Sequence, residues 1–359
     1  MSNLVKVGIT HGDSNGVSYE ILLKAFSDNR LTELLTPIIY GSSKVASYHR
    51  NVLNSKSIPF NMIAHAKECK EGQINFINAV KDDVKVEIGK PNQSAGNAAY
   101  VALEEAVADI NNSLIDALVT LPINKDSIQG QEFNFRGHTE YLENRTGGNH
   151  KALMILANDE IRVALVTTHL PISEVAANIT SEVIIEKIKT LNNSLKRDFF
   201  IDNPRIAVLS LNPHAGENGL LGKEEKEIIE PAIQKCLDSN ILCSGPYAAD
   251  GFFGSRRYKQ FDAILAMYHD QGLVPFKTIA MDSGVNFTAG LPIVRTSPAH
   301  GTAYDIAGKD EASDESFRQA LYMAVDIHRN RVAYDEARKD PLRKSYFERG
   351  KDDEKLDLS

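Results

Sequence analysis

Hydrophobic residues in this chain gather in short runs that stop at glycine, proline or histidine. The first run, residues 5–10, breaks at a His-Gly-Asp sequence and is followed by a helical pattern over residues 19–26. A β-branched run, a glycine turn and a helix form the opening of an α/β unit. The same pattern predicts strands at residues 37–40 and 117–121 and helices at residues 44–54 and 95–111. Residues 55–93 fit several short strands and turns and receive no firm assignment.

A strand followed closely by a histidine occurs three times in the second half of the chain. The strands are predicted at residues 162–168, 205–211 and 261–268, the histidines are His169, His214 and His269, and helices are predicted at residues 181–195 and 223–238. Strands that alternate with helices pair in parallel through right-handed crossovers. Their carboxyl ends then share one edge of the sheet, where open α/β sheets bind ligands. We therefore expect the three histidines to converge.

Residues 267–309 form a segment dense in ionisable and polar side chains. No helical or alternating periodicity is evident, so we expect mostly loop joined by short strands. The side chains of interest are Asp270, Lys277, Asn286, Arg295, His300 and Asp305. Ordered loops on a rigid scaffold often carry binding and catalytic groups. A solvated connection is the competing interpretation.

Length and composition narrow the class of protein. A chain of 359 residues exceeds what one hydrophobic core usually serves, so two domains are expected. The formal charge of −8 argues against nucleic acid or an anionic membrane surface as a partner. Cys69, Cys236 and Cys243 lack CxxC spacing and are interpreted as reduced thiols, with no structural zinc. No apolar run approaches the roughly 20 residues of a membrane span, and we predict a cytoplasmic protein.

The three histidines are candidates for a catalytic metal site. Three neutral imidazoles leave one coordination position of a metal open, and nitrogen ligands favour zinc, cobalt, nickel or iron over magnesium. A lone loop histidine is usually a surface residue, but three at equivalent strand ends favour the metal. Asp250 and Asp270 are candidate carboxylates for orienting the imidazoles. Asp270 could equally be a turn-forming aspartate.

A second group of residues suggests anion binding. The sequence Arg136-Gly137-His138-Thr139-Glu140 precedes a predicted helix, for which Thr139 is a suitable N-cap. Alternatively, the helix N-terminus and His138 face an anionic ligand. Lys277, Asn286 and Arg295 would supply positive charge and hydrogen-bond donors to a phosphate or carboxylate. The alternative is that these side chains are solvated surface residues. This alternative is weakest for Arg295, which lies in the apolar run GLPIVRTS.

The usual nucleotide-binding sequences are missing. Neither GxGxxG nor GxxxxGK[ST] occurs, and Gly216, Gly219 and Gly222 are spaced GxxGxxG, without the tight first turn. A nucleotide, if bound, would therefore not be held by the usual dinucleotide-binding or P-loop motif.

Several motifs together resemble the 4-hydroxythreonine-4-phosphate dehydrogenases of vitamin B6 synthesis. They are GHTEYL, TTHLP, LNPHAGENGLLGKEE, GPYAADGFFGS, YHDQGLVPFK and GLPIVRTSPAHGTAYDIAG, and the matching segments run from about residue 5 to residue 308. The resemblance implies a homodimer of two α/β/α domains with a cleft between them, as in isocitrate and isopropylmalate dehydrogenases. On this basis we expect a first domain of residues 1–128 and about 271–340, a second of about 129–270, and a polar tail of residues 341–359.

The resemblance also implies site residues. The metal ligands would be His169, His214 and His269, the last from the partner subunit, around one divalent ion (zinc, or cobalt or magnesium). Substrate contacts would be His138, Thr139, Lys277, Asn286 and Arg295. The run from His300 is similar to the cofactor loop of the wider group, which places NAD or NADP at His300, Gly301, Thr302 and Asp305.

The expected reaction is the NAD-dependent, metal-assisted oxidation of a phosphorylated hydroxy amino acid. Lys277 and then Asp270 are the candidates for moving protons, with Asp250 a further candidate catalytic carboxylate. The alternatives are a dehydrogenase of threonate or erythronate phosphate, a three-histidine metal hydrolase and, least favoured, a non-catalytic binding protein. One departure is the loop at residues 12–20, GDSNGVSYE, where the family has Gly-Asp/Glu-Pro-x-Gly-Ile-Gly-Pro-Glu. With two prolines and one glycine missing, this loop is expected to be less rigid.

Overall fold

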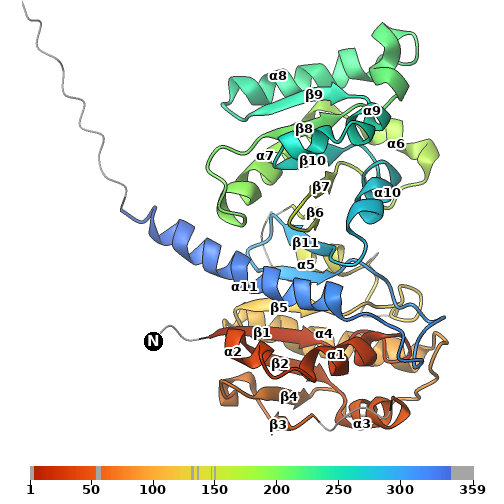
Figure 1. The fold of residues 1–359 in the computed structure, drawn as a ribbon, viewed down its shortest axis with the longest axis vertical. Coiled ribbons are helices and arrows are strands. Elements are labelled where there is room, and N and C mark those ends of the chain that lie inside the picture. Colours follow the sequence, from red (N-terminus) through yellow and green to blue (C-terminus); the bar gives the residue numbers. More distant parts are fainter. Residues whose placement is uncertain are drawn as a thin grey trace, which may run out of the picture.

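The framework of the protein is a single sheet that runs through the whole molecule (Figure 1). The computed structural model describes residues 4–53, 58–81, 83–130, 133–135, 137–146, 148 and 151–340. Within them the twelve strands are ordered β3-β4-β2-β1-β5-β12-β11-β6-β7-β10-β8-β9. The predicted polar tail, residues 341–359, lies outside the described residues.

The elements follow the predicted α/β order. In the first part of the chain they are β1 (Val5–Thr10), α1 (Ser18–Phe26), α2 (Leu31–Leu34), β2 (Leu35–Gly41), α3 (Ser43–Val52), β3 (Phe60–Ile63), η1 (Ala66–Glu68), β4 (Ile74–Asn78), α4 (Gln93–Asn111) and β5 (Ala117–Thr120). Next come α5 (His138–Arg145), β6 (Leu153–Ala157), β7 (Arg162–Leu165), α6 (Ile172–Asn178), α7 (Ser181–Arg197), β8 (Ile206–Leu209), η2 (Pro213–Gly219), η3 (Glu225–Ile229), α8 (Glu230–Asp238) and β9 (Cys243–Tyr247). The remainder are α9 (Ala249–Gly254), η4 (Arg257–Gln260), β10 (Ala263–Ala266), α10 (His269–Ala280), β11 (Val285–Ala289), β12 (Arg295–Pro298) and α11 (Glu315–Glu336).

Side chains at the helix starts explain several of these bounds. Asn92 accepts a hydrogen bond from the backbone N–H of Ala95 at the start of α4, and Thr180 does the same for Val183 at α7. Such caps satisfy backbone donors that the first helical turn leaves unpaired.

The outer strands pair in parallel, and antiparallel pairing is confined to the middle of the sheet. β7, β10 and β8 are parallel neighbours, as predicted for the three strands that precede histidines. In the middle, β11 is antiparallel to both β12 and β6, and β6 is antiparallel to β7. The predicted boundary between domains is therefore crossed by a continuous sheet, and the two-domain division remains a prediction.

One face of the sheet is covered along its whole length, whereas the other carries two separate cores. The long core includes side chains from α1, α11, α7 and α8. On the opposite face, one core packs α4 and α5 against the first half of the sheet, and another packs α9 and α10 against the second half. The central strands β12, β11 and β6 lie between these two cores, which leaves room for a ligand above them.

The segment at residues 267–309 is more regular than we expected. It contains α10, β11 and β12 before the loop that starts at Ala299. α10 contains both Gly272 and Pro275, which argue against a helix in the sequence. A Cβ on Gly272 would lie 2.7 Å from Leu165 and 2.8 Å from Val163, so the glycine permits close packing of α10 on β7. The expected short strands are therefore present as β11 and β12, and the prediction was wrong in leaving out the helix α10.

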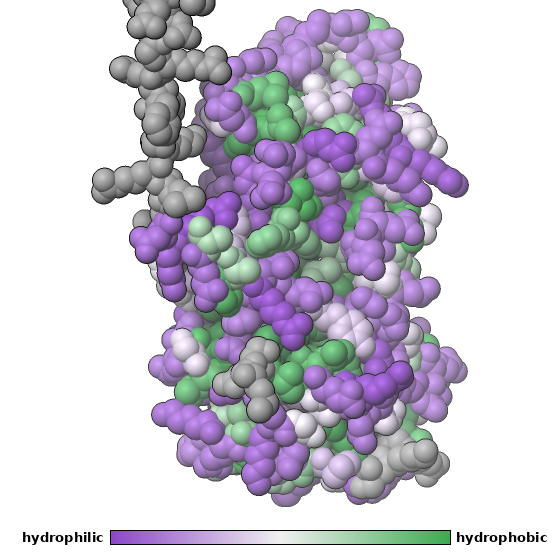
Figure 2. Space-filling model, turned by 60° about the vertical axis from the view of Figure 1, so that its left-hand side comes forward, coloured by the Kyte–Doolittle hydropathy of each residue, from purple (hydrophilic) through white to green (hydrophobic). Residues whose placement is uncertain are grey.

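The surface is mostly hydrophilic on the face that Figure 2 shows. Hydrophobic side chains occur there in small scattered groups. Among the described residues, no helix has the length and apolar character that a membrane span requires.

Candidate active site

A hollow of about 270 Å³ lies above the central strands, between the two separate cores. Its walls come from the end of β5, the start of α5, strands β6, β11 and β12, and α10. The residues predicted to contact substrate all line it: His138, Thr139, Lys277, Asn286 and Arg295. His169, His269, His300 and Gly301 line it as well. The fold thus brings together residues that are spread over 160 positions and more.

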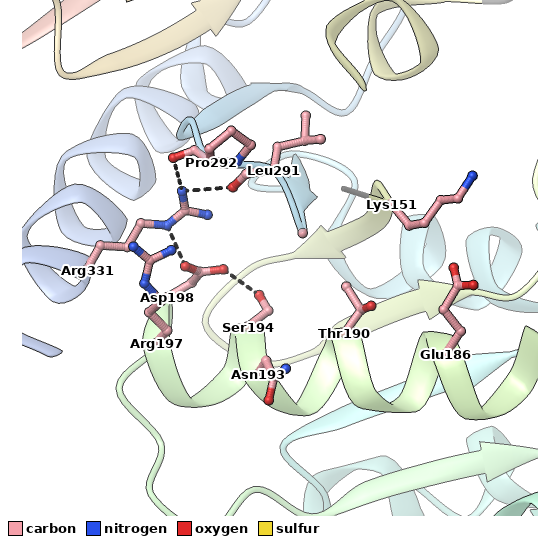
Figure 3. A pocket seen from close by; sticks show the side chains of 11 residues that line it. Lys151, Glu186, Thr190, Asn193, Ser194, Arg197, Asp198, Leu291, Pro292 and Arg331 are labelled. Carbon is pink, nitrogen blue, oxygen red and sulfur yellow. Dashed lines mark hydrogen bonds and ion pairs between the residues drawn. The ribbon is translucent and has the colours of Figure 1, made fainter. Parts of the chain in front are cut away.

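A larger hollow, of about 520 Å³, lies between α7, α11 and the turn before β12 (Figure 3). The charged groups at its end are paired with one another: Arg331 Nε lies 2.6 Å from Asp198 Oδ1, and Arg197 pairs with Asp335. Arg331 also donates to the backbone oxygens of residues 291–293. Because these arginines are already satisfied, the smaller hollow is the better candidate for anion binding.

Arg295 is a buried cation in the smaller hollow. It is 2% exposed, and its guanidinium donates to the hydroxyls of Thr120 and Thr288. Among the described residues no carboxylate forms an ion pair with it, and burial lowers the pKa of Arg295 to about 10. A charge buried against neutral hydroxyls is costly unless a ligand compensates it. This makes Arg295 a strong candidate for binding an anionic group.

The N-terminus of α5 also opens into the hollow. Its N-cap is Gly137 and no side chain caps it, so Thr139 lies inside the first turn and the N-cap prediction was wrong. The pKa of His138 is well below its ordinary value because of burial and the nearby charges of Arg295 and Lys125. His138 is therefore neutral at neutral pH. Arg136, named with this motif, lies outside the described residues.

Two buried polar atoms in the hollow have no hydrogen-bond partner within the described residues. They are Oδ1 of Asn286 and Nε2 of His300. Buried polar groups are nearly always satisfied by protein, water or ligand. Together with Lys277 on α10, they provide positions for a polar ligand.

His169 and His269 meet at one side of the hollow. Their ring centroids are 6.0 Å apart, as expected from the adjacent parallel strands β7 and β10. His214 does not join them in the same chain: in the described residues no group of three or more His, Cys, Asp or Glu side chains is arranged to hold a metal ion. Its side chain is 66% exposed on η2.

Each of the three histidines has a carboxylate on the Nδ1 side of its ring. Nδ1 of His269 lies 2.7 Å from Asp270, Nδ1 of His214 lies 2.9 Å from Glu217, and Nδ1 of His169 lies 3.8 Å from Glu140. A carboxylate on one ring nitrogen fixes the tautomer and orients the other nitrogen, which is the usual environment of a metal-ligating histidine. The donor set therefore fits a divalent metal that prefers nitrogen ligands.

The backbone around His214 is left-handed. Residues 214–218 have φ between 43° and 75°, although four of the five are not glycine. A left-handed helical turn costs roughly 1–2 kcal/mol per non-glycine residue. Gly216, Gly219 and Gly222 of the GxxGxxG spacing all have positive φ. These glycines thus serve a turn, which explains the spacing without a nucleotide.

The predicted cofactor residues lie on one irregular loop. His300 and Gly301 reach the hollow, whereas Thr302 and Asp305 are not part of its lining. The N-terminal loop holds this segment, since the backbone N–H of Val17 donates to the carbonyl of Thr302 and Tyr304 Oη donates to Asp13. Asp13, Ser14 and Asn15 are buried. Hydrogen bonds therefore hold a loop that was expected to be less rigid.

Sequence reasoning missed several residues of the site. Lys125 Nζ lies 3.3 Å from Nε2 of His169, and Thr120 contacts Arg295. Both follow or end β5, so the strand-end rule applied to the histidines could have identified them. Glu140 and Glu217 were also missed. Asp250, in contrast, is an exposed residue in the first turn of α9 and does not line the hollow.

Comparisons with known proteins identify a family for the chain. The family model described as "Pyridoxal phosphate biosynthetic protein PdxA" matches residues 33–324. A 4-hydroxythreonine-4-phosphate dehydrogenase from Bacteroides thetaiotaomicron is 57% identical over 99% of this chain and 98% of its own. A putative D-threonate 4-phosphate dehydrogenase from Oceanobacillus iheyensis is 36% identical over 91% of this chain and 99% of its own.

Solved structures lead to the same family. The crystal structure of 4-hydroxythreonine-4-phosphate dehydrogenase from Klebsiella pneumoniae is 29% identical, with a TM-score of 0.77, and the match covers 91% of this chain and 100% of that one. The extent of the family match and the identity of the relatives leave one assignment. The chain belongs to the family of pyridoxal phosphate biosynthetic proteins described as PdxA.

Proposed function

We propose that this protein oxidises 4-phosphohydroxy-L-threonine with NAD, assisted by a divalent metal. The product, 2-amino-3-oxo-4-phosphohydroxybutyrate, would then lose CO₂ to give 3-amino-2-oxopropyl phosphate. The observation that carries the proposal is the buried Arg295, which has no direct ion pair among the described residues and lies in a hollow next to two adjacent imidazoles. The 57% identity to a named dehydrogenase of this substrate supports it.

Different residues of the hollow would contact different groups of the substrate. Arg295 and Lys277 bind its phosphate or carboxylate, and the N–H groups at the start of α5 add donors. Asn286 and neutral His138 satisfy its polar groups. His169 and His269 would hold the metal, and a divalent ion bound there would supply Lewis-acid chemistry at the substrate hydroxyl. His300 and Gly301 would lie beside the nicotinamide, which would supply the hydride acceptor. Lys277 remains our first candidate for accepting the proton, because Asp270 faces outward and contacts His269.

The third imidazole would come from a second subunit. Resemblance suggested His269 for this role, but His269 lies beside His169 in the same chain, so we assign it to His214 of the partner subunit. Each histidine is followed within six positions by an exposed large apolar residue, namely Ile172, Leu220 and Val274, which are 74%, 81% and 60% exposed. Apolar side chains around a polar site favour a surface that another subunit covers. A homodimer with shared sites follows.

The test of the activity is a screen of NAD reduction by the purified protein. We expect turnover with 4-phosphohydroxy-L-threonine, lost after chelation and restored by zinc or cobalt. Preference for threonate or erythronate 4-phosphate would reassign the substrate, as the 36% identical relative allows. Hydrolysis without any requirement for dinucleotide would reject the dehydrogenase in favour of a metal hydrolase.

Subunit mixing tests which chain supplies which histidine. After exchange between His169→Ala and His214→Ala proteins, we expect about a quarter of wild-type activity, because about half the dimers are mixed and each holds one intact site. The pair His169→Ala and His269→Ala should not recover, since a site takes both histidines from the same chain and each site of a mixed dimer then carries one defect. Recovery by the second pair and not by the first would instead mean that His269 comes from the partner subunit. No recovery in any pair after verified exchange would reject the shared site.

A further inference from the structure

We propose that Glu225 is a positioning residue that fixes the left-handed turn carrying His214. This inference rests on the proposed role of His214 and adds a residue to it. Glu225 is the first residue of η3, eleven positions beyond the histidine, and it is 2% exposed. None of the residues assigned above to substrate, cofactor or metal includes it, yet it is a buried carboxylate close to the turn.

The carboxylate of Glu225 holds the entry to the turn. Its Oε1 accepts hydrogen bonds from the backbone N–H groups of Leu211 and Asn212, both at 2.8 Å. Its Oε2 accepts a third from the side-chain amide of Asn212 at 3.0 Å. In the described residues no cation forms an ion pair with it, so its charge is satisfied by these N–H groups. The chain direction after β8 is therefore set two residues before His214.

The same carboxylate also fixes the middle of the turn. A Cβ on Gly216 would lie 2.6 Å from Oε2 of Glu225 and 3.0 Å from the backbone oxygen of Gly222, and Gly216 has φ +75°. The turn thus fits against Glu225 with no room for a side chain. Lys226, the next residue, donates to the backbone oxygen of Asn218 at 3.0 Å. Entry, middle and exit are all held by the segment that begins at Glu225.

A turn that is unfavourable on its own needs such support to keep one conformation. With the backbone fixed, the contact between His214 Nδ1 and Glu217 orients the ring, and the His214 side chain is 66% exposed. The role of Glu225 is to keep that imidazole where the second subunit can use it. It touches neither substrate nor metal, which separates it from a catalytic residue.

The experiment compares Glu225→Ala with the conservative Glu225→Gln and with Glu227→Ala, an exposed glutamate of the same segment. We expect Glu225→Ala to lower metal retention and kcat/KM by roughly ten- to a hundredfold, as for other residues that support metal ligands. Excess zinc should restore part of this loss, unlike in His214→Ala. Glu225→Gln keeps the oxygen that accepts the two backbone N–H groups and should stay within about threefold of wild type, as should Glu227→Ala.

Mixing separates positioning from general damage to the fold. Glu225→Ala mixed with His269→Ala should regain about a quarter of wild-type activity, whereas mixing with His214→Ala should give no gain. If Glu225→Ala does not fold, Asn212→Ala, which removes the amide contact from a less buried position, replaces it with the same expected pattern. Unchanged metal retention and kcat/KM would overturn the proposal. The proposal would also be overturned if Glu225→Ala regained no activity with His269→Ala while His214→Ala did regain activity with His269→Ala. If neither pair regained activity, the shared site would be rejected, and metal retention alone would decide on Glu225.

Discussion

His269→Ala should lose its bound metal and nearly all NAD reduction. The imidazole of His269 lies beside that of His169, and its Nδ1 contacts Asp270, so alanine removes an imidazole that is already oriented for its proposed role as a metal ligand. A metal that polarises the reacting oxygen contributes several kcal/mol to the transition state, and 1.4 kcal/mol corresponds to tenfold in rate. We therefore expect kcat to fall about a thousandfold or more.

Metal content and thermal unfolding accompany this measurement. His269 is partly exposed at the start of α10, so the alanine variant should keep its fold and unfold at nearly the same temperature. His65→Ala is the matched control, because His65 is an exposed histidine at the far edge of the first half of the sheet. Stoichiometric metal in His269→Ala protein would contradict the assignment of this histidine.

The meeting of His169 and His269 could be predicted from sequence because it depends on topology alone. Residues just past neighbouring parallel strands share one edge of the sheet, and β7 and β10 are such neighbours. β8 also lies beside β10, and on that rule His214 should have joined the pair. What sends it elsewhere is the left-handed turn, which depends on contacts with Glu225 from a separate segment. Strand order therefore predicts that a histidine lies at this edge of the sheet, whereas the local backbone conformation determines where its side chain points.

The sequence of β11 contains an alternation of apolar and polar residues that is typical of a half-buried strand. In β11, Val285, Phe287 and Ala289 face the long core, whereas Asn286 and Thr288 alternate with them on the side of the hollow. This is the period of a half-buried strand. It covers only five residues, too few to stand out beside the glycines and prolines of the segment. The sequence of α10 does not indicate a helix, because Gly272 and Pro275 both disfavour one. The close packing of Gly272 on β7 becomes visible only in the structure.

Asp270 was a candidate from the sequence for orienting an imidazole and contacts His269, whereas the carboxylates on the other two histidines could not have been predicted. Glu140 meets His169 across 29 positions and from a different element, and neither strand order nor periodicity indicates that pairing. Long-range side-chain contacts of this kind depend on the angle at which α5 leaves Gly137. The fold class was therefore accessible from pattern, the main site residues from resemblance, and partners such as Glu140 and Glu217 only from the structure.

Arg295→Met should make the protein more stable and less active. The guanidinium lies in the fold with hydroxyl partners only, and burial lowers its pKa to about 10, which means that the folded state disfavours the charge. The unfolded chain binds the proton more tightly, so stability would rise only as pH increases above about 10. At pH 7 the cost is fully present. Methionine, of similar length and uncharged, removes it.

Loss of the charge removes the anchor for the substrate anion. A hydrogen bond to a charged group contributes about 1.5–3 kcal/mol, so kcat/KM should fall roughly ten- to a hundredfold or more. The unfolding free energy without substrate should rise by about 1 kcal/mol, the lower end of the gain seen when buried charges are replaced by apolar groups. Substrate should stabilise the wild type more than the variant, because ligand stabilisation follows affinity.

Arg162→Met is the matched control for this experiment. Arg162 is also largely buried, its pKa is also lowered by burial, and its guanidinium stacks on Phe199, 4.7 Å from the ring centroid, in a different hollow. Its replacement should leave kcat/KM unchanged, whatever it does to stability. Chemical denaturation at pH 7 and steady-state kinetics on both variants separate the two effects. An Arg295→Met protein with unaltered kcat/KM would remove this arginine from the substrate site, and one that is less stable would show that its hydroxyl partners already compensate the buried charge.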